Sequence, residues 1–118
     1  PVVYAAADAC FVPLRRGEYF TINIPSKTFE IMACARPIIL GAQGQARAIV
    51  EEAQAGIAVP PEDADAYAEA VRRLYADPAL RERWGSNGRA YVLENFTRRE
   101  KARRYLDVLA GVVGEGAP

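Results

Sequence analysis

The chain has 118 residues, 51% of them hydrophobic, which is enough for one domain with a single core. It carries 15 basic and 15 acidic residues, so its net charge is zero, which argues against a nucleic-acid-binding protein, because such domains are normally basic. No apolar run approaches the roughly 20 residues that a membrane-spanning helix needs, and no signal peptide opens the chain. We therefore expect a cytoplasmic chain without nucleic acid among its partners.

The rare residue types restrict the chemistry. The chain has no histidine, which removes Ser-His-Asp and Cys-His nucleophiles and the usual zinc ligands. Cys10 and Cys34 lie in apolar surroundings outside any CxxC pattern, so we expect two small buried side chains rather than a disulfide or a zinc site. Any catalysis within the chain must use carboxylates, amines, hydroxyls or backbone groups.

The first half of the chain alternates between short apolar runs and segments with helical spacing. It predicts, in chain order, the end of a helix at 2–8, a strand at 10–14, a loop at 15–23, a helix that starts at Pro25 and stops at Arg36-Pro37, a strand at 38–40, a helix at 45–55 capped by Gly56, and a strand at 57–59. The stripe expected to face the core on the helix after Pro25 is Phe29, Met32 and Ala33. This alternation predicts an α/β fold with a Rossmann-like, partial parallel sheet flanked by helices.

The second half predicts helices only. Asp63 or Asp65 can cap the first helix, and Asp77-Pro78 is a strong start signal for the second. The side chains expected on one face of the first helix are Tyr67, Ala70, Val71, Leu74 and Tyr75, and those of the second are Leu80, Trp84, Gly88, Tyr91 and Val92. Glycine disfavours a helix interior by about 1 kcal/mol relative to alanine, so Gly85 and Gly88 suggest a break or a close helix contact.

The last predicted helix starts with a capping box formed by Thr97 and Glu100. Its spacing predicts a buried stripe, followed by a tail at 114–118, and the stripe consists of Ala102, Tyr105, Leu106, Leu109 and Val113. The same helix carries a basic cluster that indicates a solvated face or, alternatively, contact with an anionic membrane surface, and it consists of Arg98, Arg99, Lys101, Arg103 and Arg104.

Candidate binding residues gather at the start of the helix after Pro25. Lys27 and Glu30 are three residues apart and share one helix face. A helix start with free N–H groups and a lysine suits a phosphate, and a carboxylate one turn further on could accept hydrogen bonds from sugar hydroxyls. The alternative is an exposed pair of side chains that stabilise the helix by about 0.2–0.5 kcal/mol. The loop from Gly41 to Gly44 follows the next strand, at the side where open α/β sheets bind ligands.

One segment resembles a known family. The string Pro25-Ser26-Lys27-x-Phe29-Glu30-x-Met32-Ala33-x-x-Arg36-Pro37-Ile38 is similar to the nucleotide-sugar-binding segment of GT-B retaining glycosyltransferases of the family 4, or "group 1", type. The resemblance continues through Gly44, Glu51-Glu52-Ala53-x-Ala55-Gly56, Val59-Pro60-Pro61-Glu62-Asp63, Trp84-Gly85-x-Asn87-Gly88-Arg89 and Asn95-Phe96-Thr97. It covers residues 7 to 109, and the order and spacing of its parts make it fairly specific.

The resemblance implies that residues 1–118 are the C-terminal part of a donor-binding domain, incomplete at its N-terminus. The whole enzyme would transfer a sugar from a nucleotide-diphosphate donor, UDP-linked by expectation, to a glycan or a lipid-linked acceptor, with peripheral contact at the inner membrane face as an option. Glu30 would hold the ribose hydroxyls, and Lys27 with the Ser26 backbone would hold the diphosphate and neutralise the leaving group. The remaining donor-binding residues that it implies are Pro25, Gly41 and Gly44. The resemblance also implies no metal and no cofactor, because helix dipoles and basic side chains would hold the diphosphate.

The sequence also departs from the family pattern. Ile22 stands eight positions before Glu30, where the family has its first glutamate, and Asn23 and Glu18 are the nearest polar side chains. Ala35 replaces the glycine usual before Arg36-Pro37. The isolated chain is expected to be inactive, and a missing N-terminal domain or a second chain is expected to cover the sheet edge.

Two other functions remain open. A non-hydrolysing nucleotide-sugar epimerase would share the fold and the phosphate contacts, and a non-catalytic α/β binding module would keep the fold without the chemistry.

Overall fold

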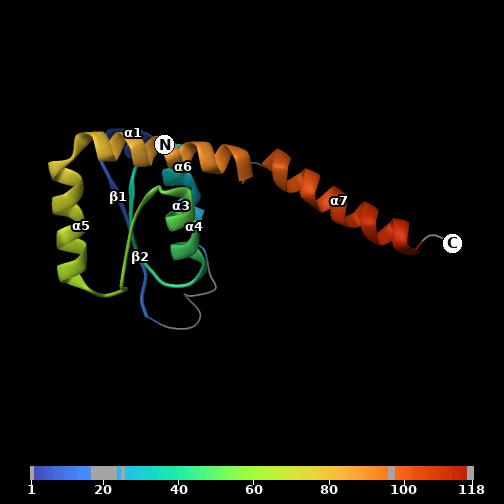
Figure 1. Cartoon of the computed structure of the whole chain (residues 1–118), viewed down its shortest axis with the longest axis horizontal. Coiled ribbons are helices and arrows are strands. Elements are labelled where there is room, and N and C mark those ends of the chain that lie inside the picture. The colour runs from blue at the N-terminus through green and yellow to red at the C-terminus, as the bar shows by residue number, and fades with distance from the viewer. Residues whose placement is uncertain (1, 17–23, 25, 96–97, 117–118) are drawn as a thin grey trace.

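The computed structural model describes residues 2–16, 24, 26–95 and 98–116. Their body is built on a parallel three-stranded sheet in the order β1-β2-β3 (Figure 1). The strands are Cys10–Pro13 (β1), Ile38–Gly41 (β2) and Gly56–Val59 (β3), and Cys10 is in register with Ile38, which is in register with Gly56. The predicted α/β fold with a partial parallel sheet is therefore confirmed.

The helices are α1 (Val2–Ala6), α3 (Ser26–Ala33), α4 (Gln45–Ala53), α5 (Ala64–Ala76), α6 (Pro78–Asn95) and α7 (Arg98–Gly116). Alternate residues of β2 serve the two faces of the sheet, because successive strand side chains point to opposite sides. Ile38 and Leu40 pack with Ile31 of α3 and Val50 of α4, whereas Ile39 packs with residues of α5 and α6. The sheet thus lies between α3 and α4 on one side and α5 on the other.

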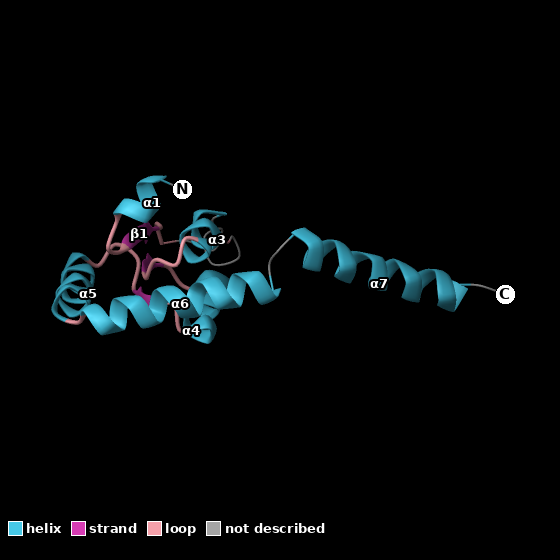
Figure 2. Ribbon diagram, turned by 90° about the horizontal axis from the view of Figure 1, so that it is seen from above, coloured by secondary structure: helices cyan, strands magenta, loops and turns pink. Residues whose placement is uncertain are grey.

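Helix α6 crosses the edge of the sheet at which the strands begin (Figures 1 and 2). It fixes the ends of two other helices, because the Arg89 Nη1 group donates to the Ala33 carbonyl at 2.6 Å and Asn87 Nδ2 donates to the Gln54 carbonyl at 3.0 Å. These bonds satisfy carbonyl groups that helix ends leave without intrahelical partners. The segment from Trp84 to Arg89 therefore has a structural role.

The glycines of α6 mark a close contact and no break, since the helix is continuous. A Cβ at Gly85 would overlap the carbonyl oxygen of Ala35. A Cβ at Gly88 would lie 3.1 Å from the Ala55 Cβ and 3.3 Å from the Met32 Cβ. Only glycine allows α6 to approach the end of α3 this closely.

Local start signals were predicted well. The Asp63 Oδ1 atom accepts from the Ala66 N–H at 3.0 Å, and the Asp77 Oδ1 atom accepts from the Leu80 N–H at 3.0 Å, so both predicted caps are confirmed. The predicted cap at Gly56 is wrong. Gln54 takes the left-handed conformation at the end of α4, with φ 52°, and Gly56 begins β3, where a Cβ would overlap the Ile38 carbonyl.

Several burial predictions need correction. On α3, Met32 is buried, Phe29 and Ala33 are only partly buried, and Thr28 and Ile31 complete the buried face. On α5, Ala70 and Leu74 are buried, but Val71 and Tyr75 are 42% and 84% exposed. They line, with Phe11 of β1, a cavity of about 300 Å³ on the α5 side of the sheet. Cys10 and Cys34 are free thiols, but both are partly exposed rather than buried.

Helix α7 is the largest departure. The predicted buried stripe is exposed, because α7 extends away from the body instead of lying across it (Figure 2). Tyr105, Leu106 and Val113 are all more than 60% exposed. The predicted tail is also wrong, because the helix continues to Gly116. Thr97 of the expected capping box lies outside the described residues. No helix in the described part of the chain is both long and apolar enough to cross a membrane.

Candidate functional site

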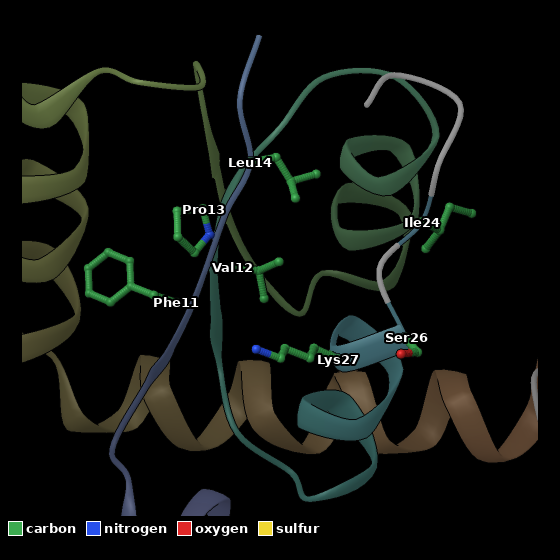
Figure 3. A pocket seen from close by; sticks show the side chains of 7 residues that line it. All are labelled: Phe11, Val12, Pro13, Leu14, Ile24, Ser26 and Lys27. Atoms are coloured by element: carbon green, nitrogen blue, oxygen red, sulfur yellow. The ribbon is translucent and has the colours of Figure 1, made fainter. Parts of the chain in front are cut away.

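The first turn of α3 opens onto a cavity of about 600 Å³ beside the end of β1 (Figure 3). Ser26 and Lys27 are exposed, and the Lys27 side chain extends from α3 towards β1. Val12 and Leu14 project from β1 towards the side on which Lys27 and α3 lie. Ile24, just before α3, also lines the cavity. The cavity therefore combines apolar walls, one ammonium group and the free N–H groups of a helix start, which is an arrangement suited to an anion.

Glu30 faces a different space. The Tyr4 hydroxyl of α1 donates to the Glu30 Oε2 atom at 3.1 Å, and the two side chains line a cavity of about 340 Å³ together with Ala33 and Cys34. This bond to a carboxylate is the main reason why the pKa of Tyr4 lies above its ordinary value. The alternative, an exposed pair of Lys27 and Glu30, is not confirmed, because Glu30 accepts from Tyr4 and the Lys27 side chain extends towards β1 (Figure 3).

The two candidate glycines lie at the end of the neighbouring strand. Gly41 is the last residue of β2, its carbonyl accepts from the Leu14 N–H at 2.9 Å, and a Cβ there would overlap the Tyr67 hydroxyl. Gly44 directly precedes α4 with φ 77° and ψ −140°, a conformation that side chains disfavour. Gly44 has no side chain that could cap α4, so within the described residues the first N–H groups of this helix receive no hydrogen bond from their cap residue.

The structure brings together some of the predicted residues and separates others. Ser26 and Lys27 line one cavity and Glu30 lines another, on the same short helix, while Gly41 and Gly44 line neither of them. Pro25 lies outside the described residues. So do Glu18, Ile22 and Asn23, the positions that bear on the missing first glutamate.

Two contacts near the site were missed at the sequence level. The first is the bond from Tyr4 to Glu30, which joins residues 26 positions apart. The second is made by Arg16, whose Nε group donates to the Pro61 carbonyl at 3.1 Å and lies 3.9 Å from the Glu62 carboxylate. Arg16 thus links the loops after β1 and β3. The sequence carries no signal for this contact, because Arg16 and Pro61 are 45 positions apart.

Comparison with known proteins identifies the family to which the chain is similar. The sequence model of the family described as Glycosyl transferases group 1 matches residues 1–77. The chain is 32% identical over 113 residues to the GDP-mannose-dependent alpha-(1-6)-phosphatidylinositol monomannoside mannosyltransferase of Mycolicibacterium smegmatis, covering 94% of this chain and 30% of the relative. It is 33% identical over 107 residues to the D-inositol 3-phosphate glycosyltransferase of Streptomyces bingchenggensis, covering 91% and 22%.

A solved structure matches as well. Sucrose-phosphate synthase from Thermosynechococcus elongatus superposes with a TM-score of 0.76 at 33% identity, over 93% of this chain and 27% of the synthase chain. The fold is therefore that of part of a GT-B glycosyltransferase. More particularly, the chain belongs to the group 1 glycosyl transferase family. It spans less than a third of the length of these relatives.

Proposed function

We propose that this chain supplies part of the donor site of an enzyme that transfers a sugar from a nucleotide-diphosphate sugar to an acceptor. The observation that carries the proposal is the pairing of Ser26 and Lys27 on one cavity, at the start of α3 and beside the end of β1. Open α/β sheets bind ligands at this edge. Family membership supports transfer rather than epimerisation or binding alone, since both curated relatives described above are transferases.

The chemistry assigned to the chain is electrostatic. When the bond between sugar and diphosphate breaks, negative charge grows on the leaving diphosphate, so cationic groups held nearby stabilise the transition state more than the ground state. Lys27, the Ser26 backbone and the other N–H groups that start α3 would provide this stabilisation, and Pro25 is a further donor-binding residue of the proposal. Glu30 would accept hydrogen bonds from the ribose. The bare start of α4 at Gly44, next to Gly41, would give a second place for a phosphate or sugar.

The identity of the donor and the acceptor belongs to the same proposal. We propose a UDP-linked donor, and GDP is the necessary comparison because the mycolicibacterial relative is named for GDP-mannose. We propose a glycan or lipid-linked acceptor bound outside this chain, a cytoplasmic location with peripheral contact at the inner membrane face, and no metal requirement. A further segment or chain would cover the outer edge of β1.

Titration with UDP and with GDP, followed by amide shifts in NMR spectra, tests the donor site. We expect the largest shifts at 26–30 and 41–45, and unchanged affinity in the presence of EDTA. Lys27→Ala should weaken binding, whereas Lys101→Ala, at the other lysine of the chain, should not, because Lys101 lies on the projecting helix α7. A folded chain that binds neither nucleotide, or a Lys101→Ala effect equal to that of Lys27→Ala, would contradict the proposal.

A further inference from the structure

Tyr4 is held by two hydrogen bonds, one at its hydroxyl group and one at its backbone carbonyl. Its Oη atom donates to the Glu30 Oε2 atom at 3.1 Å, and its backbone carbonyl accepts from the Arg36 Nε group at 3.1 Å. The Tyr4 ring is partly buried and packs against the core between the sheet and α3. These two bonds connect α1 to Glu30 within α3 and to Arg36 in the segment that follows α3.

This contact restricts a side chain that would otherwise be free to move. Glu30 is exposed, and fixing a long glutamate side chain costs rotamer entropy. A hydrogen bond to one carboxylate oxygen leaves the lone pairs of the other oxygen available, and a carboxylate is an acceptor only. A prefixed Glu30 can therefore receive donors from a ligand without paying the whole ordering cost at the moment of binding.

We propose that Tyr4 is a positioning residue that holds the Glu30 carboxylate ready to accept hydrogen bonds from the ribose hydroxyls of the donor nucleotide. The inference rests on the proposed function. The cavity of about 340 Å³ that Tyr4 and Glu30 share with Ala33 and Cys34 is the space for the sugar ring. The diphosphate extends from there around the first turns of α3 to Lys27, which lies three residues earlier and lines the neighbouring cavity of about 600 Å³.

The test compares each nucleotide, UDP or GDP, with its 2′,3′-dideoxy form on the wild-type chain and on two variants. Tyr4→Phe removes the hydroxyl and keeps the packed ring, and 2′,3′-dideoxy-UDP lacks the hydroxyls that Glu30 would bind. Tyr91→Phe is the matched control, because the Tyr91 hydroxyl also donates to a glutamate, Glu52, at 2.9 Å. UDP and its dideoxy form, and GDP with its own, are titrated calorimetrically against the 118-residue chain and both variants.

We expect Tyr4→Phe to weaken UDP binding about three- to tenfold, because part of the ordering cost of the Glu30 side chain would then fall on the binding step, and to leave dideoxy-UDP binding unchanged. Tyr91→Phe should change neither. Equal weakening of both nucleotides by Tyr4→Phe would reduce Tyr4 to a structural role and overturn the inference, as would no change in either. Failure of the wild-type chain to bind any nucleotide would instead overturn the proposed function and this inference with it.

A second measurement needs only the wild-type chain. Cys34 lines the same cavity, so UDP should slow its alkylation by iodoacetamide, as followed by mass spectrometry of the peptide that contains it. The protection should be weaker with dideoxy-UDP in the wild type. Protection that is equal for the two nucleotides would contradict a ribose contact at Glu30.

Discussion

Alanine substitution at three glycines tests whether close packing of α6 holds α3 in place. In an unobstructed helix, Gly→Ala is favourable by about 1 kcal/mol. At Gly85, however, the new Cβ would overlap the Ala35 carbonyl, which is backbone and cannot rotate away. At Gly88 the nearest atoms are the Ala55 Cβ at 3.1 Å and the Met32 side chain at 3.3 Å, and at Gly111 no atom lies within 4 Å of the new Cβ.

We expect Gly85→Ala to lower the free energy of unfolding by about 1–2 kcal/mol, because an overpacking cost of up to about 3 kcal/mol exceeds the gain in helix propensity. Gly88→Ala should stay within about 1 kcal/mol of the wild type, since the two effects nearly cancel. Gly111→Ala should cost nothing and raise the helicity of α7. Urea unfolding followed by circular dichroism measures all three changes. A Gly85→Ala chain as stable as the Gly111→Ala chain would refute the packing argument.

Three further changes test the charges and the caps. Lys27→Ala should weaken UDP binding at least about threefold at low salt and less at high salt, because salt screens an exposed charge; titrations at two ionic strengths measure the ratio. Asp63→Ala removes the acceptor of the Ala66 N–H and should lower the unfolding free energy by about 1 kcal/mol, with Asp63→Asn restoring most of it. Hydrogen bonds from Arg103 and then Arg104 hold the pKa of Glu100 below its ordinary value. Because the pKa of Glu100 is lower in the folded chain, its carboxylate stabilises α7 above the unfolded pKa, and this stabilisation is lost as the pH falls through the folded pKa. The helicity of α7, measured by circular dichroism, should therefore decrease in acid, and Glu100→Gln should abolish that decrease.

The order of elements could be predicted because its signals are local. A cap such as Asp77-Pro78 and an apolar run such as that at 38–40 act within a few residues of where they stand. Side-chain periodicity, in contrast, tells which residues share a face and says nothing about whether a surface lies opposite. For this reason the stripe of α7, which was predicted as buried, is exposed, and so are Val71 and Tyr75, which were expected to share a face with the buried side chains of α5.

The candidate site was predictable to the same degree. Lys27 and Ser26 lie where their motif places them, at the start of a helix, because helix starts have a sequence signature. The bond from Tyr4 to Glu30 had no such signature, since it depends on how α1 docks against α3. The end of α4 was also mispredicted, since its cap is the left-handed Gln54 and not Gly56. Gly56 is needed in β3, because a Cβ there would overlap the Ile38 carbonyl, and a contact between two strands has no local sequence signature.

Helix α3 connects these observations, because its two ends meet different demands. Its first residues, Ser26 and Lys27, are exposed at the edge where the strands end, and its last carbonyls are held by Arg89 and approached by Gly85 of α6 at the opposite edge. A helix of eight residues has little stability of its own, so its position comes from packing. The contacts that α6 makes at the far end of α3 therefore help to set the position of Lys27 at its start, although they lie away from the candidate site.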